Sequence, residues 1–380
     1  KMFIKKRIII FSLTPLGIGG MEENILQLAE GLQTRFEVKI LGWFTPPFLI
    51  QAAARLPKTE LLPIERPSKY NFLFGLRLLK LFRRLKPDLV HFQDPRSRLL
   101  GGPITNILGI KSVYTFHMSP LLMPHSPFKA RVYTKIEKLY NRHFTDALIF
   151  VSKNVKDFYA RLGLLRTQKP NDFVIRNGID SAPFLPLLAE KQQFRTAVRT
   201  QLQVLPETRL VLGLGRLTVQ KGFDYLIQAI ALLPSKGLPP FKIILLGDGE
   251  ARAQLHALAK TLEVEDALIW LGFQDKPQVR EYLIAADLFV LPSRYECYPY
   301  SILEANAAQI PVLVSDVGGS AEAAALNANH TVIPPHDPMA LANALAQALQ
   351  APLRVPNVVK TSLDDMLAQT RTVYDLLLDR

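Results

Sequence analysis

Short apolar runs alternate with amphipathic runs along the whole chain. Ten apolar runs have the length of β-strands: residues 7–13, 36–41, 88–92, 111–117, 146–152, 209–215, 241–247, 267–272, 287–293 and 310–316. Between them lie segments with a helical spacing of apolar residues, for example 21–32, 222–234 and 250–263. Near-continuous apolar strands separated by helices are typical of parallel sheets covered on both faces. The pattern therefore predicts an α/β fold built from doubly wound, Rossmann-like units.

A chain of 380 residues has room for about two domains of ~100–200 residues each. Glycine and proline interrupt the pattern between residues 176 and 191. Residues 7–32 and 209–233 each read as strand, glycine-bearing loop and helix. We therefore expect two similar domains, 1–180 and 181–360. Residues 361–380 should form a terminal helix that packs back on the first domain.

The basic and then apolar start of the chain also fits a short signal peptide. An amphipathic helix follows at once and no small-residue cleavage site is evident, which favours a buried first strand. The single cysteine, Cys297, excludes an intrachain disulfide and fits a reducing compartment. No uncharged apolar run reaches the ~18 residues of a membrane-spanning helix.

Charge is distributed unevenly. The formal net charge is +13. Residues 1–180 carry 29 Lys and Arg against 13 Asp and Glu, whereas residues 181–380 carry 17 against 20. The first half is therefore +16 and the second −3. This asymmetry indicates an anionic partner for the first half, either a nucleic acid or a membrane surface.

Two loops between a predicted strand and a predicted helix have the residues of phosphate sites. Gly17, Gly19 and Gly20 would let backbone N–H groups approach a phosphate at a helix N-terminus, although a plain tight turn explains them equally well. The dinucleotide fingerprint G-x-G-x-x-G fails because Glu22 stands at its last position. Arg216 and Lys221 follow a strand in the second half. They are either solvated surface cations or residues that bind a diphosphate.

The stretch PSRYECYPYSILEANA places Glu296 in a strand-end loop and Glu304 on the helix that follows. The first carboxylate could accept hydrogen bonds from sugar hydroxyls, and the second from both hydroxyls of a ribose, with a helix N-terminus between them for phosphate. The alternative, a pair of solvated glutamates, fits poorly with the apolar setting of Glu304. His117 ends another strand and could be packed or functional; His91 has a similar place, so position alone does not decide.

Together these residues resemble the retaining glycosyltransferases of family four, whose GT-B fold has two Rossmann-like domains facing each other across a cleft. The resemblance covers nearly the whole chain in the family's order. It rests on GIGGMEEN, TFH, GRLTVQKG, GDGE and LIAADLFVLPSRYECYPYSILEANAAQIPVLVSDVGG. The glutamate pair followed by PVLVSDVGG is its specific part.

The resemblance implies an enzyme that moves a hexose from a UDP-, GDP- or ADP-sugar to an acceptor hydroxyl with retention, in bacterial cell-surface polysaccharide or glycolipid assembly. Its catalytic residues would be His117, near the reacting carbon, and Glu296, on the transferred sugar. The resemblance also implies that Gly19 and Gly20 lie beside the donor phosphates and that Arg216 and Lys221 neutralise the diphosphate. Phe273 and Gln274 would hold the base, and Glu304 would bind the ribose. Phosphate or sugar would be contacted by Tyr300, Ser301 and Ile302.

Cations and N–H dipoles aimed at the leaving diphosphate would lower the barrier. No D-x-D occurs in the sequence, so we expect neither a metal nor another cofactor. The donor phosphate would take the acceptor proton on the same face, and a covalent intermediate on Glu296 is the less favoured alternative. The family often has glycine at the positions of Cys297, Pro299 and Gln309, so the resemblance does not define the sugar pocket of this chain. Pro299 also has no backbone N–H to donate.

Two basic and apolar segments suggest what the first domain docks on. They contain Arg77, Lys80, Arg83, Arg84 and Lys86 in one, and Lys129, Arg131 and Lys135 in the other. Each could be an ordinary core-facing helix, but the charge of the domain favours docking on anionic lipid. We therefore expect a cytoplasmic protein, peripheral on the inner face of the cytoplasmic membrane, with a lipid-linked or membrane-proximal saccharide acceptor.

Other classes of protein remain as alternatives. No nucleic-acid-binding module is recognisable, and an oxidoreductase would need the failed fingerprint. A sugar-nucleotide epimerase or hydrolase on the same fold would act without an acceptor. A non-catalytic membrane- or nucleic-acid-binding protein, or a lectin-like relative, would not need both Arg216 and Glu296.

Overall fold

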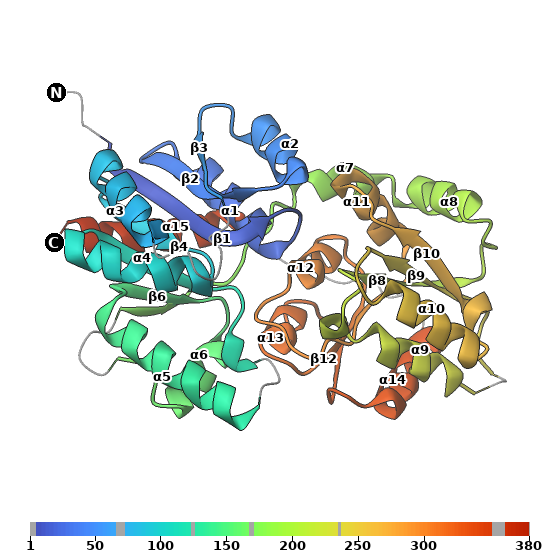
Figure 1. Cartoon of the computed structure of the whole chain (residues 1–380). Coiled ribbons are helices and arrows are strands. Elements are labelled where there is room, and N and C mark those ends of the chain that lie inside the picture. Colours follow the sequence, from blue (N-terminus) through green and yellow to red (C-terminus); the bar gives the residue numbers. More distant parts are fainter. Residues whose placement is uncertain are drawn as a thin grey trace. The chain divides into compact units, whose positions relative to one another are not determined.

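The computed structural model describes residues 5–65, 73–122, 126–166, 171–234, 237–351 and 362–379. Parts of three predicted segments lie outside these ranges, namely Asn71 and Phe72 in the first basic segment, residues 123–125 in the second, and Thr361 and Arg380 of the terminal helix. All ten predicted strands are present, and helices separate them (Figure 1). The α/β prediction is confirmed, with two parallel sheets of Rossmann type.

The chain folds as two compact units. Unit 1 consists of Lys1–Asn177 and Leu363–Arg380, and unit 2 of Gly178–Ser362. The change from unit 1 to unit 2 falls within the interrupted stretch 176–191, three residues before the boundary expected from the sequence.

The sheet of unit 1 has the order β3-β2-β1-β4-β5-β6-β7. Its strands are β1 (Arg7–Leu16), β2 (Glu37–Phe44), β3 (Glu60–Pro63), β4 (Leu89–Phe92), β5 (Lys111–Phe116), β6 (Ala147–Phe150) and β7 (Asp172–Val174). Its helices are α1 (Gly20–Leu32), α2 (Pro46–Arg55), α3 (Leu73–Leu85), α4 (Pro95–Leu108), the single turn η1 (Pro120–Leu122), α5 (Pro127–His143), α6 (Lys153–Arg161) and α15 (Leu363–Leu378). Every strand pair is parallel.

Both faces of this sheet are buried, which is why its central strands are mostly apolar. On β1, Ile8 and Ile10 pack in one core with α1, α2 and α15. Phe11 points to the opposite face and meets Phe82 of α3, with ring centroids 6.2 Å apart. Successive strand residues alternate between faces, so a strand covered on both sides needs no polar positions.

The sheet of unit 2 has the order β10-β9-β8-β11-β12-β13. Its strands are β8 (Arg209–Leu214), β9 (Phe241–Leu246), β10 (Leu268–Gly272), β11 (Leu288–Leu291), β12 (Val312–Ser315) and β13 (His330–Ile333). Its helices are η2 (Ala182–Phe184), α7 (Leu185–Ala189), α8 (Lys191–Gln201), η3 (Val219–Lys221), α9 (Phe223–Ala231), α10 (Arg252–Thr261), η4 (Glu265–Ala267), α11 (Lys276–Ala285), α12 (Tyr300–Ala307), α13 (Ser320–Ala324) and α14 (Pro338–Gln350). Apolar residues of α9, α10 and α14 form one core with the sheet.

The structure adds three strands that the apolar pattern does not predict: β3, β7 and β13. All three lie at sheet edges and have three or four residues. An edge strand is covered less completely than a central one and need not be apolar at every position. In β13, for example, three of the four residues are exposed.

Candidate active site

Three of the predicted donor residues of unit 2 lie on loops where the strand order reverses. The chain goes from β8 to β9 on one side of β8, and later returns to β11 on the other side. Arg216 and Lys221 lie on the segment that follows β8, and Glu296 lies on the loop that follows β11. Ligands of open α/β sheets bind at this topological switch point, outside the carboxyl ends of the strands.

Lys221 and Glu296 are in direct contact. The Nζ of Lys221 lies 2.6 Å from Oε1 of Glu296, and the Ser293 hydroxyl donates to the same oxygen at 2.8 Å. The Glu296 residue is 8% exposed, so its negative charge needs these partners. An ammonium group has three donors, and two of them remain for other acceptors. Arg216 is exposed and makes no side-chain hydrogen bond or ion pair with the residues that the structure describes.

A second ion pair ties these two loops together. Arg294, after β11, donates two hydrogen bonds to the carboxylate of Asp224 on α9, at 2.7 and 2.6 Å. Its guanidinium also lies over the ring of Tyr225, 4.1 Å from the centroid. Bidentate geometry fixes direction as well as distance. The pair therefore holds the Glu296 loop against the segment that carries Lys221.

Gly318 sets the position of the Glu296 backbone from a third loop, after β12. It has a φ of 52°, and a Cβ at this position would lie 1.6 Å from the carbonyl oxygen of Glu296. Any larger residue would displace the Glu296 loop. This contact gives a physical reason for the glycine in the motif PVLVSDVGG.

The N-terminus of α12 follows the Glu296 loop. Its N-cap residue is Pro299, and no side chain caps the helix. The N–H groups of the first turn lie at a helix N-terminus, a place that suits an anion, and the contacts expected of Tyr300, Ser301 and Ile302 stay predictions. The Ser301 hydroxyl is also buried without a hydrogen-bond partner among the described residues, as is that of Thr218 in the segment after β8.

The remaining residues predicted for donor binding lie in the same unit. Glu304 is half-buried on the second turn of α12. Phe273 and Gln274 follow β10, at the edge of the sheet beyond β9. The Phe273 residue is 57% exposed, and the Gln274 amide donates to the Leu271 carbonyl at 2.8 Å. An exposed aromatic ring beside a fixed amide could serve a nucleotide base, a role that stays a prediction.

In unit 1, Gly19 is the N-cap of α1 and Gly20 is its first residue; both are exposed. Glu22, in the first turn, accepts a hydrogen bond from the backbone N–H of Gly17 at 3.3 Å. A carboxylate already lies at this helix N-terminus, where it is electrostatically favoured. A donor phosphate would have to displace this contact or bind beside it.

The two histidines of unit 1 have different environments. Both ring nitrogens of His91 are bonded inside the core, to the hydroxyls of Tyr374 at 2.6 Å and Thr115 at 2.7 Å. His117 is half-buried, and its Nε2 lies 2.6 Å from Oε1 of Gln93. Burial lowers the pKa of each imidazole to about 3, and the nearby His117 adds to the effect on His91. His91 is therefore structural, because its hydrogen-bonding capacity is used.

The Gln93 contact also fixes the tautomer of His117. An amide oxygen only accepts, so Nε2 of His117 carries the proton and Nδ1 keeps its lone pair. Neutral His117 can then accept a hydrogen bond from a hydroxyl at Nδ1.

Sequence reasoning missed several residues of this arrangement, notably Gln93, Asp224, Ser293 and Arg294. Ser293 could have been predicted, because it lies three residues before Glu296 at the end of a predicted strand. The others pair with residues far along the chain, such as Arg294 with Asp224, 70 positions apart. Nothing in the local pattern indicates such partners.

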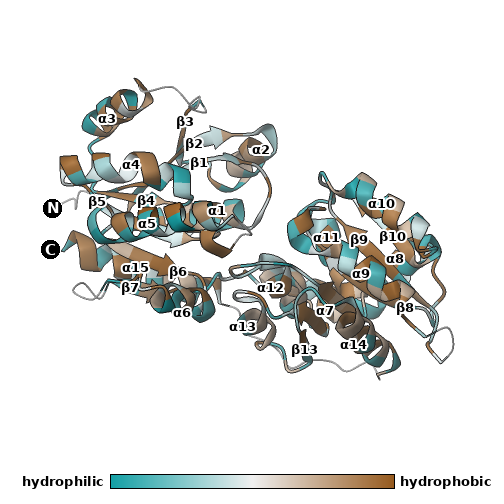
Figure 2. Ribbon diagram, turned by 60° about the horizontal axis from the view of Figure 1, so that its bottom comes forward, coloured by the Kyte–Doolittle hydropathy of each residue, from teal (hydrophilic) through white to brown (hydrophobic). Residues whose placement is uncertain are grey.

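The predicted membrane residues lie on two helices of unit 1. α3 buries Phe74, Leu78 and Phe82, while Leu73 is 60% and Leu76 is 56% exposed. Figure 2 shows hydrophilic and hydrophobic residues side by side on α3. The residues Arg77, Lys80, Arg83, Arg84 and Lys86 are all exposed. On α5, Lys129, Arg131 and Lys135 are exposed, and so is Phe128, at 75%.

Within the described ranges, no helix is both long and apolar enough to cross a bilayer. The same residues contain no group of three or more His, Cys, Asp or Glu side chains that could hold a metal ion.

Comparison with known proteins identifies the family to which the chain belongs. The family model "Glycosyltransferase Family 4" matches residues 18–182, and the model "Glycosyl transferases group 1" matches residues 194–361. An uncharacterised glycosyltransferase of Methanocaldococcus jannaschii is 26% identical over 89% of this chain and 87% of its own length. The alpha-monoglucosyldiacylglycerol synthase of Acholeplasma laidlawii is 27% identical over 81% of this chain and 80% of its own.

The Anabaena protein HepE, solved with UDP and glucose, has a similar fold. Its TM-score is 0.79 at 21% identity, over 98% of this chain and 100% of that chain. The two family models together span most of both units, in the order in which the predicted motifs occur. The chain therefore belongs to the glycosyltransferases of family 4 and has the two Rossmann-like domains of the GT-B fold.

Proposed function

We propose that the protein transfers a hexose from a nucleoside-diphosphate sugar to an acceptor hydroxyl, with retention of the anomeric configuration. The observation that carries the proposal is the group at the switch point of unit 2. Arg216, Lys221 and the N-terminus of α12 supply positive charge and N–H donors, while Glu296 supplies a buried carboxylate. Such a group suits a donor that carries an anionic diphosphate beside a sugar rich in hydroxyls.

The reaction breaks the bond between the anomeric carbon and the donor phosphate oxygen. The acceptor oxygen bonds to that carbon, and its proton passes to the departing phosphate on the same face. Negative charge grows on the nucleoside diphosphate, so Arg216 and Lys221 act in the transition state. In this proposal the fixed cations neutralise the leaving group without a metal ion. His117 would accept a hydrogen bond from the transferred sugar at Nδ1.

Unit 1 is proposed to bring the acceptor, at an anionic membrane surface. Three observations support this: the charge of +16 on residues 1–180, the exposed apolar side chains beside exposed cations on α3 and α5, and the lipid product in the name of the Acholeplasma relative. A lipid-linked saccharide of a surface polysaccharide or glycolipid fits this setting.

A calorimetric screen with UDP-, GDP- and ADP-sugars tests the donor proposal directly. One nucleotide class should bind to the wild-type protein and lose affinity in the Arg216→Ala variant. Proton NMR of the product formed from an α-linked donor should then give an α-linkage, and EDTA should leave the rate unchanged. Failure of all three donor classes to bind would contradict the proposal.

A further inference from the structure

A pocket of about 510 Å³ lies in unit 1, at the amino ends of its strands. Five basic residues and one acid line it, and we call this set the amino-edge pocket: Lys6, Arg7, Arg83, Lys86, Asp88 and Lys111. Arg7 and Lys111 begin β1 and β5, whereas Gly19 and His117 follow the far ends of the same strands. At about 3.3 Å per residue, the six residues of β5 separate the two ends by ~20 Å. The pocket is therefore distinct from the loops that contain the candidate site residues of unit 1.

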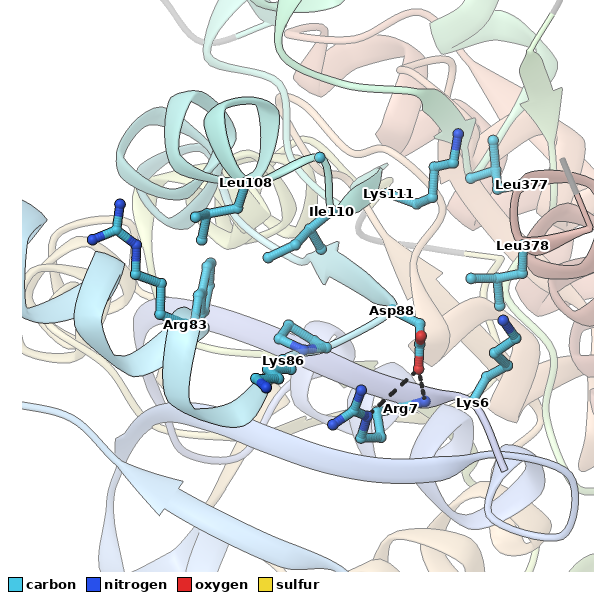
Figure 3. Close-up of a pocket in the computed structure, with 13 residues that line it drawn as sticks. Lys6, Arg7, Arg83, Lys86, Asp88, Leu108, Ile110, Lys111, Leu377 and Leu378 are labelled. Carbon is cyan, nitrogen blue, oxygen red and sulfur yellow. Dashed lines mark hydrogen bonds and ion pairs between the residues drawn. The ribbon is translucent and has the colours of Figure 1, made fainter. Parts of the chain in front are cut away.

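Most of the positive charge in the amino-edge pocket has no partner among the residues that the structure describes. Asp88 is bound by Arg7, whose backbone N–H donates to it at 2.7 Å and whose side-chain Nε lies 3.6 Å from the same oxygen. The side chains of Lys6, Arg83, Lys86 and Lys111 make no hydrogen bond or ion pair with any residue in the described ranges. Figure 3 shows these four side chains on different sides of the pocket.

The negative ends of nearby helix dipoles compensate only part of this positive charge. α3, α4 and α15 all end at the pocket, and each C-terminus is equivalent to about −0.5 charge. Arg7 already donates to the Leu85 carbonyl at the end of α3, at 3.3 Å. Five cations and one carboxylate leave a formal +4, which exceeds the roughly −1.5 of three helix ends. The remaining positive charge would attract an anion.

Part of the wall of the pocket is apolar. Figure 3 shows Leu108 and Ile110 on one side and Leu377 and Leu378, from the end of α15, on the other. A volume of about 510 Å³ lies within the range of small-ligand sites. Cations beside apolar side chains suit a ligand with an anionic head and an apolar body. Lys86 has a φ of 46°, a conformation that favours glycine, so a long cationic side chain is kept there at some cost in backbone energy.

We propose that the amino-edge pocket is a second anion site that binds a phosphate group, independent of the donor residues of unit 2. The phosphate has two possible sources, a free phosphate and the headgroup of an anionic lipid. The apolar side chains favour the lipid, because a free ion gains nothing from them.

Calorimetry with two probes tests the site and identifies the source. The probes are inorganic phosphate and dihexanoylphosphatidic acid below its micelle concentration. The test variant is Lys6→Gln/Lys111→Gln, which removes two unpaired cations of the pocket. The matched control is Lys5→Gln/Lys58→Gln, which removes two exposed lysines of the same unit that do not line the pocket. Equal melting temperatures would show that both variants are folded.

The wild-type protein should bind at least one probe, and the pocket variant should bind it at least about tenfold more weakly, because charged hydrogen bonds are lost. The control and the Arg216→Ala variant should bind as the wild type does. Tighter binding of the lipid probe identifies a headgroup; equal binding of both identifies a free phosphate. No binding at millimolar probe, or equal loss in the pocket variant and the control, would overturn the proposal. Loss only in the Arg216→Ala variant would also overturn it, because the anion would then occupy the donor site.

Discussion

Lys221 and Glu296 form an ion pair, with 2.6 Å between Nζ and Oε1. The resemblance to family four assigns the first to the diphosphate and the second to the sugar, yet in the structure they hold each other. The ion pair compensates the charge of a buried carboxylate and leaves two ammonium donors for phosphate. This contact therefore couples folding to donor binding. It also distinguishes Lys221, which forms the ion pair, from Arg216, which does not.

Lys221→Met and Arg216→Met should separate these two effects. Lys221→Met leaves the Glu296 charge buried without its cation, so the free energy of unfolding should fall by about 3 kcal/mol. Arg216→Met removes an exposed side chain and should leave stability unchanged. Both variants should bind the nucleoside diphosphate about tenfold more weakly or worse. Urea unfolding and calorimetry measure the two quantities; equal stabilities would show that the ion pair is unimportant for folding.

The two glutamates of the site should affect different ligands. Glu304→Ala should weaken the free nucleoside diphosphate and the nucleotide sugar alike, because the proposed ribose contact is common to both. Glu296→Gln should leave the nucleoside diphosphate within a fewfold of wild type but lower the transfer rate by at least about tenfold. Titration with both ligands provides the measurement. Equal losses for both ligands in the Glu296 variant would refute the division.

Gly318→Ala should displace the Glu296 loop. The new Cβ would meet the Glu296 carbonyl oxygen at 1.6 Å, in addition to the strain of a φ of 52°. Gly163→Ala is the matched control, since it has a φ of 64° and no heavy atom within 4 Å of the added Cβ. The control should lose about 1–2 kcal/mol of stability from backbone strain alone. Gly318→Ala should lose more, and its transfer rate should fall as well; equal behaviour of the two variants would contradict the close contact.

Stability should fall in mild acid because of His91 and His117. Burial lowers the pKa of both to about 3, from an ordinary 6.5. Between these values the unfolded chain binds protons that the folded chain does not, so stability is complete above pH 6.5 and decreases below it. Each histidine should cost about 1.4 kcal/mol per pH unit in that window.

Urea unfolding at pH 7.5 and 5.5 measures this dependence. His91→Gln should reduce the loss of stability between the two pH values, whereas His143→Gln, which changes an exposed histidine of α5, should not. An unchanged pH dependence in the His91 variant would mean that this imidazole is protonated in the folded protein.

Membrane docking should depend on where the charge lies. The protein should sediment with phosphatidylglycerol-rich vesicles, bind neutral ones weakly, and be released by salt. Reversal of Arg83, Arg84 and Lys86 to Glu, or of Lys129, Arg131 and Lys135 to Glu, should weaken binding, at about 1 kcal/mol per residue near the surface. Reversal of three other exposed lysines, Lys5, Lys58 and Lys260, makes the same change in net charge and should have less effect. If the wild-type protein ignores anionic vesicles at low salt, the basic surface has another function.

The local sequence pattern was enough to predict the α/β class, the ten strands with apolar runs, and the loops that carry Arg216, Lys221, Glu296 and His117. These features are local, because a strand buried on both faces is mostly apolar, and the residue after it falls at the sheet edge. The pattern did not predict β3, β7 or β13, since short edge strands are only partly covered.

How these residues pair depends on the packing of distant segments in the folded protein. Lys221 meets Glu296 across 75 positions of sequence, and Gln93 meets His117 across 24. The two histidines look alike in sequence, each at the end of an apolar strand. They differ because Tyr374, on a helix 283 positions further along, occupies one ring nitrogen of His91. Hydrogen bonds and ion pairs act over a few ångströms in space, and the packing of strands and helices brings together partners that no local pattern encodes.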